Sequence, residues 1–352
     1  MTVASITYNF DQMLTTTLMN YRKKLYDNVF NACPFFYWLH ANGRKRIEDG
    51  GERIVIPLQY GRNTTIKSMT SGYSIIDTTP QDNITAAYYE WKEVSGSISI
   101  SNKELVKNSG KHKVIDLLQA KTNEAEMSMT EELEGMVIGK ITGGQAAADF
   151  LSIWEFLQKT PSGVDTVGGI AQGTYAWWRN QVLSAGYTTW AAMLAAMASM
   201  YNSCSKGGAQ GKRAHPDMIL TDQNAYESYE SACVEKTRLY NEKVGDLGYG
   251  GLKYKGCTMM WDEYMPDVYT DTTSVTPATV DTYTYTKHNM AFINSDFIDF
   301  VIARGQDLTV GPFIQPENQK AKTSIIYIMG EVCCSNRRKQ GLLMNITASL
   351  AA

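Results

Sequence analysis

The sequence is poor in the residue patterns that build metal and catalytic sites. Its few histidines never form an HExxH or HxxxH pattern, which argues against a zinc hydrolase. Its cysteines form no CxxC pair, so we expect reduced thiols and no metal site. The histidines are at positions 40, 112, 215 and 288, and the cysteines at 33, 204, 233, 257, 333 and 334. GxSxG and GxGxxG motifs are also absent, and we therefore expect no cofactor.

An excess of positive charge is missing as well. Lysine and arginine number 33 against 36 aspartates and glutamates, a formal net charge of −3, which argues against a protein that holds nucleic acid mainly by charge. The low-charge stretch 190–201 is too short to cross a bilayer, and the N-terminus does not resemble a signal peptide, so we expect no membrane partner. With 352 residues, the chain is long enough for about two domains and a sizeable core.

Four local motifs are candidates for functional sites. Residues 207–212 resemble a phosphate loop, but the first glycine and the final serine or threonine are missing, which favours a mobile basic loop. Asp262 and Glu263 lie beside aromatic residues, as in a sugar-cleaving site, but adjacent strand residues point to opposite faces. The pair Trp177 and Trp178 favours buried anchoring over a ligand platform. The cluster 337–339 favours a solvated turn or an inter-subunit charge pair over nucleic-acid contact. We expect no catalytic residues.

The first hundred residues predict an arm and a long loop. Apolar residues at helical spacing over 10–29 predict an amphipathic helix, and the aromatic block 33–39 must be covered by its own core or by a neighbour. A strand is expected over 52–60, where Pro57 favours an edge or a bulge. Further strands are expected over 86–93 and 97–101. The connection before them is longer than most loops of a compact domain, which suggests a partner.

The remaining sequence predicts a long helix followed by alternating helices and strands. The apolar stripe over 103–138, interrupted near Ser109, predicts a helix that lies across a sheet. A short helix is expected near 150–157. Residues 186–310 read as a second α/β domain, with Thr189 as a helix cap and a Thr-rich hairpin or loop at 270–286. Strands at 324–334 and 341–348 can pair with the sheet under the long helix, which would make that domain discontinuous.

Several segments, in this order, resemble the major capsid proteins of tailed bacteriophages. They are Ile56 to Asn63, Trp91 with Ser97 to Ser101, Gly168 to Ile170, Ala176 to Asn180, and Asp217 to Asp222. The resemblance covers nearly the whole chain. It implies an α+β fold of the Hong Kong ninety-seven type, with an N-terminal arm at 1–49 and an extended loop with flanking strands at 50–100. It also implies a peripheral domain with a spine helix at 101–185 plus 311–352, and an inserted axial domain at 186–310.

The resemblance also implies a function and partners. The chain would be a non-enzymatic structural protein of the virion that self-assembles through hexamers and pentamers into an icosahedral head around double-stranded DNA. We expect a separate scaffolding protein, a portal, only weak non-specific DNA contact, and assembly in the host bacterial cytoplasm. The loops at 206–213 and 270–286 are candidate exposed or axial contacts. The alternatives are a glycoside hydrolase and a carbohydrate-binding virion protein.

Overall fold

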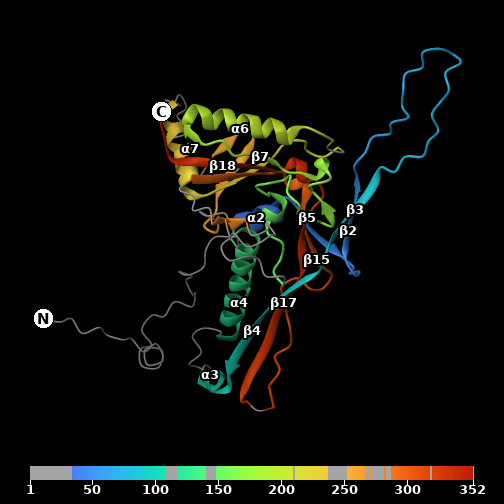
Figure 1. The fold of residues 1–352 in the computed structure, drawn as a ribbon. Coiled ribbons are helices and arrows are strands. Elements are labelled where there is room, and N and C mark those ends of the chain that lie inside the picture. The colour runs from blue at the N-terminus through green and yellow to red at the C-terminus, as the bar shows by residue number, and fades with distance from the viewer. Residues whose placement is uncertain are drawn as a thin grey trace. The chain divides into compact units, whose positions relative to one another are not determined.

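The structure of this chain is a computed structural model that describes residues 34–107, 117–139, 148–208, 211–236, 252–265, 270–271, 281–282, 287–317 and 319–351. The chain divides into two compact units (Figure 1). Among described residues, the first unit contains 96–128 and 310–326, and the second contains 34–95, 129–309 and 327–351, apart from the gaps given above. The predicted helix at 10–29 and the break near Ser109 lie outside the described residues.

A seven-stranded sheet organises the second unit. Its order is β10-β11-β9-β14-β18-β7, and β8 also pairs with β18. The strands are β7 (Gln181–Leu183), β8 (Tyr187–Thr189), β9 (Met218–Thr221), β10 (Lys253–Tyr254), β11 (Cys257–Trp261), β14 (Lys287–Ile293) and β18 (Gly341–Ala351). Strand β9 is buried at all four residues, as its short apolar run predicts for a strand covered on both sides.

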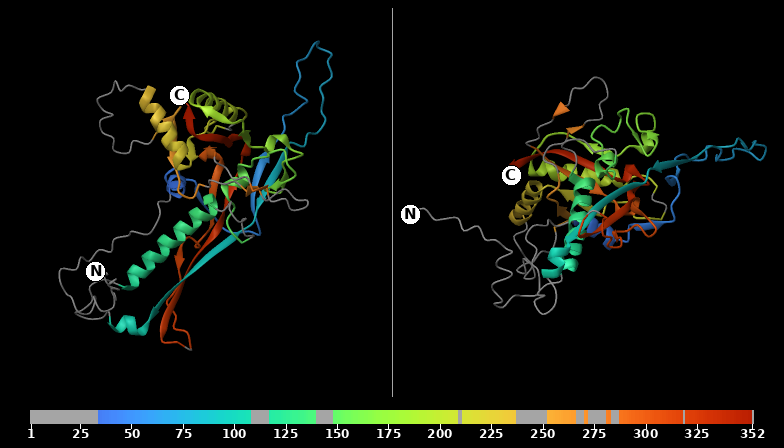
Figure 2. Two further views of the ribbon diagram at one scale, coloured as in Figure 1. Left: turned by 60° about the vertical axis from the view of Figure 1, so that its left-hand side comes forward. Right: turned by 90° about the horizontal axis from the view of Figure 1, so that it is seen from below.

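Two helices cover this sheet and share one core with it (Figure 2). Helix α6 (Trp190–Ser205) begins where the Thr189 hydroxyl accepts a hydrogen bond from the Ala192 amide at 3.3 Å, which confirms the predicted cap. Helix α7 (Gln223–Lys236) follows β9 directly. Methionines of α6 at 193, 197 and 200 pack with Ile219, Met259, Phe292 and Leu343 of the strands. Flexible thioethers suit this contact because they fill irregular gaps between helix and sheet.

A five-stranded sheet contains β1 (Lys45–Glu48), β4 (Lys92–Ser101), β15 (Ile298–Ala303), β16 (Thr309–Val310) and β17 (Ala321–Cys334). Strand β17 pairs antiparallel with β15, and β1 pairs parallel with β15 on the other side. The expectation that both C-terminal strands join one sheet is therefore wrong. Strand β18 pairs instead with β14, β7 and β8, because its buried apolar residues face the methionine-rich core under α6.

The aromatic block forms helix α2 (Pro34–Ala41), which buries Phe35 and Leu39 and leaves Tyr37 exposed. Helix α4 (Leu117–Glu134) continues as a π-helical turn, η2 (Gly135–Gly139), and buries Met129, Leu133 and Met136 as its stripe predicts. In the second unit, Leu133 lines a small cavity together with Phe300 of β15 and Ile328 of β17. The C-terminal turn of α4 therefore lies near this sheet.

Strands β2 (Ile54–Gln59) and β3 (Ile84–Tyr89) form a separate antiparallel ribbon joined by residues 60–83. This confirms the long hairpin expected from the sequence. Strand β2 pairs only with β3 among the described residues, as expected for a strand that contains Pro57.

The shorter elements are α3 (Asn102–Lys107), α5 (Ile153–Phe156), β5 (Thr166–Val167), β6 (Ile170–Ala171), η3 (Ala176–Trp178), β12 (Thr270–Asp271), β13 (Asp281–Thr282), η5 (Ser295–Phe297) and η6 (Arg337–Lys339). Strands β12 and β13 pair antiparallel, so the described part of the Thr-rich segment is a hairpin.

Candidate assembly surfaces

The loop between β2 and β3 projects from its unit and carries large apolar side chains into solvent (Figure 1). Tyr73 is 97% exposed and Ile75 is 96% exposed. Ile66, Met69 and Ile76 are also exposed. An isolated exposed apolar side chain is ordinary, but a group of them on one projecting loop marks an interaction surface. We call residues 60–83 the projecting loop.

Local polar contacts give the projecting loop defined turns without a core of its own. The Asn63 side chain accepts hydrogen bonds from the Thr65 amide at 2.9 Å and its hydroxyl at 2.6 Å. The Asp77 carboxylate likewise accepts hydrogen bonds from the Thr79 hydroxyl and the Thr79 amide, and these bonds lower the pKa of the Asp77 carboxyl. Lys67 lies 3.7 Å from Asp77 across the loop. Short Asx turns of this kind hold a loop in shape while leaving its apolar residues outward.

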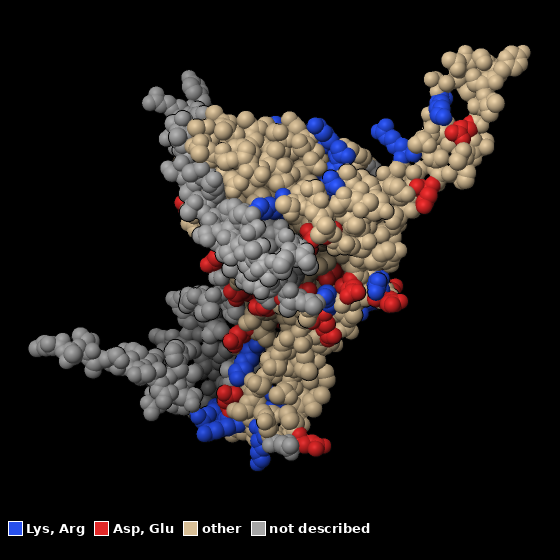
Figure 3. Space-filling model, viewed as in Figure 1, with Lys and Arg blue, Asp and Glu red and all other residues tan. Residues whose placement is uncertain are grey.

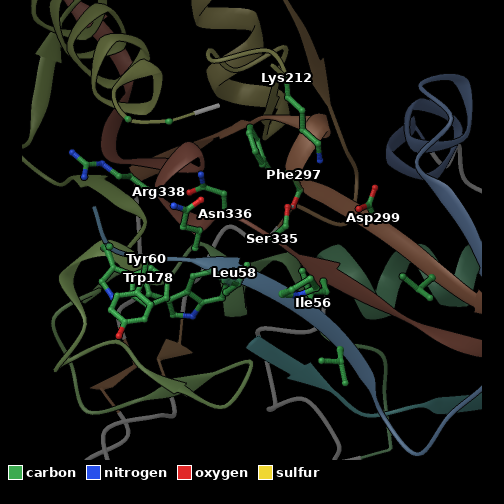
Figure 4. A pocket seen from close by; sticks show the side chains of 18 of the residues that line it. Ile56, Leu58, Tyr60, Trp178, Lys212, Phe297, Asp299, Ser335, Asn336 and Arg338 are labelled. Carbon is green, nitrogen blue, oxygen red and sulfur yellow. The ribbon is translucent and has the colours of Figure 1, made fainter. Parts of the chain in front are cut away.

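A groove of about 650 Å³ lies along β2 within the same unit (Figure 4). Its cations are Arg46, Arg62, Lys206, Lys212 and Arg338, and its acids are Glu48 and Asp299. Lysine and arginine side chains gather where the projecting loop leaves the unit (Figure 3). Because the whole chain is mildly acidic, this concentration of cations favours an acidic partner.

Trp177 and Trp178 anchor the wall of the groove and do not form a ligand platform. Trp178 is buried, and its indole N–H donates to the Val167 carbonyl at 2.9 Å. Trp177 stacks on Tyr60, with ring centroids 5.5 Å apart. The predicted buried anchoring is therefore confirmed for Trp178, whereas Trp177 is half-buried and its stack fixes the root of the projecting loop against η3.

The prediction of a solvated turn at 337–339 is wrong for two of its three residues. Arg337 and Lys339 are each 0% exposed, and only Arg338 points outward. The Lys339 ammonium donates to the carbonyls of Ser205, Lys206 and Gly207 at 3.1 to 3.2 Å, where α6 ends. A cation there satisfies carbonyls that lack intrahelical partners and faces the negative end of the helix dipole.

The Arg337 guanidinium occupies a buried polar pocket. It donates to the Phe156 carbonyl, the Gln172 side chain and the Asn180 side chain at 3.2, 3.0 and 3.4 Å. Burial lowers its pKa. Nothing in the local sequence indicates burial, because the three acceptors come from segments far away along the chain.

The basic Gly-rich loop is tied down at its C-terminal end. The Lys212 ammonium donates to the Asp296 carbonyl at 2.6 Å, and the Arg213 amide donates to the Asp296 carboxylate at 2.8 Å. Arg44 also pairs with that carboxylate. The prediction of a mobile loop therefore does not hold for residues 212–213; residues 209–210 lie outside the described part.

Asp262 does meet a second carboxyl, but its partner is Glu134 at the end of α4 rather than Glu263. Both side chains of this pair are buried, whereas Glu263 is exposed. Glu134 accepts hydrogen bonds from the Phe35 and Phe36 amides at 2.8 and 3.1 Å. Burial and the Asp262 charge raise the pKa of Glu134 to about 9, while the two amide bonds oppose that shift. The pair therefore shares a proton in the buried interior of the unit, rather than facing an open cleft as a sugar-cleaving pair would.

The described ranges contain no cluster of three or more metal-binding side chains, and no helix there has the length and apolarity needed to span a bilayer. The described cysteines, at 204, 233, 257, 333 and 334, are free thiols. Two of the described histidines have separate local partners: His288 pairs with Asp222, whereas His215 stacks on Tyr201.

Solved structures with the same fold were found, although no protein-family model and no curated sequence matches the chain. A capsid protein of cyanophage A-1(L) shares 14% identity, with 94% of this chain and 97% of that chain covered and a TM-score of 0.67. The SrpI encapsulin of Synechococcus elongatus shares 9% identity, with 98% of both chains covered and a TM-score of 0.57. The capsid protein of a native GTA particle shares 13% identity, covers 94% and 95%, and has a TM-score of 0.56.

These similarities extend over nearly the whole chain, and they define its class. The chain has the fold of shell-forming capsid proteins, with α+β architecture, an extended loop, a long helix and an α/β domain. The fold implied by the resemblance to tailed-phage capsid proteins is thereby confirmed.

Proposed function

We propose that this chain is the major capsid protein of a tailed bacteriophage, a non-enzymatic virion protein that self-assembles through hexamers and pentamers into an icosahedral shell around double-stranded DNA. The observation that carries the proposal is the projecting loop, which offers exposed apolar side chains from a chain with a capsid fold. Subunits with several such contacts form closed shells even when each contact is modest, because a subunit held by several partners gains from effective concentration.

The strand pairings support a division of the subunit into two domains. The five-stranded sheet with α4 corresponds to the peripheral domain, and the seven-stranded sheet with α6 and α7 to the axial domain. This proposal moves β7 and β18 into the axial domain and β15 and β16 into the peripheral domain, relative to the boundaries at 186 and 310. Residues 1–49 remain the proposed N-terminal arm, and 50–100 the proposed extended loop with its flanking strands.

The proposed partners are further copies of this chain, a separate scaffolding protein, a portal and DNA held by weak contacts. Assembly would take place in the bacterial cytoplasm. Glycoside hydrolysis finds no support, because Asp262 is buried against Glu134 while Glu263 is exposed. A hydrolase needs two carboxyls that face one cleft.

Negative-stain electron microscopy and size-exclusion light scattering of the expressed chain test this function, alone and with a co-expressed scaffolding protein. Shells, tubes or rings of five or six subunits are expected. A strictly monomeric protein under both conditions would contradict the proposal.

Deleting residues 64–84 tests the projecting loop itself. The variant should remain folded, because the loop carries exposed rather than core side chains, but should not form normal shells. Circular dichroism checks folding and electron microscopy checks assembly. Normal shells from the deletion variant would refute the assembly role of the loop.

A further inference from the structure

The groove along β2 holds positive charge that the described residues of its own chain do not fully neutralise. Arg46 pairs with Asp299 at 3.2 Å, and the Lys212 ammonium is bound to the Asp296 carbonyl. Arg62, Lys206 and Arg338 are exposed and form no ion pair within the described part of the chain. Figure 4 shows Arg338 and Lys212 at the same opening, above β2. Three uncompensated cations in one concave surface favour an anionic occupant.

The floor of this groove is the open edge of a strand. Residues 55–62 line it consecutively, although alternate side chains of a strand point to opposite faces, so the backbone edge itself faces the groove. The Tyr60 amide donates to the Asn83 carbonyl, so Tyr60 bonds inward, toward the partner strand. In an antiparallel pair every second residue bonds inward in this way, and the residues between them face outward. Val55, Pro57 and Gln59 therefore direct their backbone groups outward, away from β3. Because proline has no N–H, this outer edge lacks a hydrogen-bond donor at Pro57.

This combination favours an extended peptide over nucleic acid. An outward strand edge can bond to the backbone of another extended segment, and flanking side chains then select its charge. Single strands bound without sequence preference need exposed rings on which bases stack, and a duplex bound through its phosphates would leave the outward strand edge unused. Here Tyr60 and Trp177 stack on each other.

One segment of this chain has the complementary composition. Residues 263–286, which we call the acidic segment, contain Glu263, Asp267, Asp271 and Asp281 and no lysine or arginine. The segment is rich in threonine, valine and tyrosine, which favour extended structure. Its described residues include the buried Met265 and the antiparallel pair of Thr270–Asp271 with Asp281–Thr282.

We propose that the groove along β2 receives the acidic segment of a second copy of this chain. This inference rests on the proposed capsid function and names a contact that joins neighbouring subunits. Groove and segment are different patches, so the contact is head-to-tail, and repetition of such a contact closes rings. Salt weakens the contact, because screening shortens the range of charge interactions from about 10 Å at 0.1 M to about 3 Å at 1 M.

Two charge-reversal variants test the contact. R62E/R338E makes the groove acidic, and D267K/D271K/D281K makes the segment basic, with three lysines against Glu263, so each variant alone sets like charges against each other. We expect each to lose about tenfold or more of its assembled fraction, because like-charge contacts are strongly unfavourable. The matched control K253E/K322E reverses two exposed lysines outside the groove and should assemble as the wild type does. Circular dichroism checks that all variants are folded.

Mixing the two variants shows whether the contact joins different copies. The acidic groove of one variant fits the basic segment of the other, and the remaining groove and segment also match. Six-membered rings can therefore alternate the two variants, and we expect rings in the mixture that neither variant forms alone. The combined variant R62E/R338E/D267K/D271K/D281K should also recover assembly, including five-membered rings.

Three results would overturn the inference while leaving the capsid function intact. One is wild-type assembly by R62E/R338E. Another is recovery by the combined variant but not by the mixture, which would place the contact within one chain. The third is loss of assembly that neither the mixture nor the combined variant recovers, together with loss of binding of R62E/R338E to a fluorescent DNA 30-mer. That result would make the groove a DNA site. Failure of the wild-type chain to assemble would instead contradict the proposed function.

Discussion

Replacing Glu134 by glutamine should remove a large part of the pH dependence of stability. The folded protein raises the pKa of Glu134 from 4.5 to about 9, chiefly through burial and then through the Asp262 charge. Between these values the folded state binds one proton that the unfolded state releases. Stability therefore falls as pH rises, by about 1.4 kcal/mol per pH unit, and rises again on acidification.

The expected magnitude between pH 6 and pH 8 is about 2.7 kcal/mol in the free energy of unfolding. Glutamine fills the same space and offers Asp262 an N–H donor, but it keeps only one acceptor for the Phe35 and Phe36 amides. The lost hydrogen bond lowers stability at every pH, whereas the lost proton changes the slope with pH. Glu331 adds a similar slope, because burial raises its pKa to about 8, and that contribution stays in both proteins.

Urea unfolding of the unassembled subunit from pH 5 to pH 9 measures the difference. E134Q should lose about 1.4 kcal/mol per pH unit of slope relative to the wild type. The control E132Q changes an exposed glutamate on the same helix and should keep the wild-type slope. Equal slopes for E134Q and the wild type would refute the shared proton.

Two further substitutions test the buried cations at 337 and 339. K339M should cost about 2 kcal/mol of stability in urea unfolding, because three carbonyls at the end of α6 lose their donor. The control R338M changes the exposed neighbour and should change stability by less than about 0.5 kcal/mol. R337M should cost about 3 kcal/mol, because it leaves the Phe156 carbonyl and the Gln172 and Asn180 side chains without their donor, and R337K should recover part of that loss. Equal stability of K339M and R338M would contradict the capping role, and an unchanged R337M would contradict the buried network.

Predictions that depend on local pattern agree with the structure. The Thr189 cap, the edge position of Pro57 and the buried stripe through Met129 and Leu133 all follow from spacing or from one residue's backbone chemistry. The projecting loop was also expected, because its length exceeds what a compact domain needs. The ordered segments that resemble phage capsid proteins predicted the fold that the structural similarities confirm.

The sequence by itself therefore determined the helices, strands, caps and long loop, since these depend on neighbours within a few residues. Only the tertiary structure decided which distant groups meet. It buried Arg337 and Lys339 in a cluster that looks solvated in sequence, joined Glu134 to Asp262, and placed β18 in the sheet under α6. Burial and charge pairing at these sites depend on acceptors that come from remote segments of the chain. The local pattern of residues does not predict which remote segments provide them.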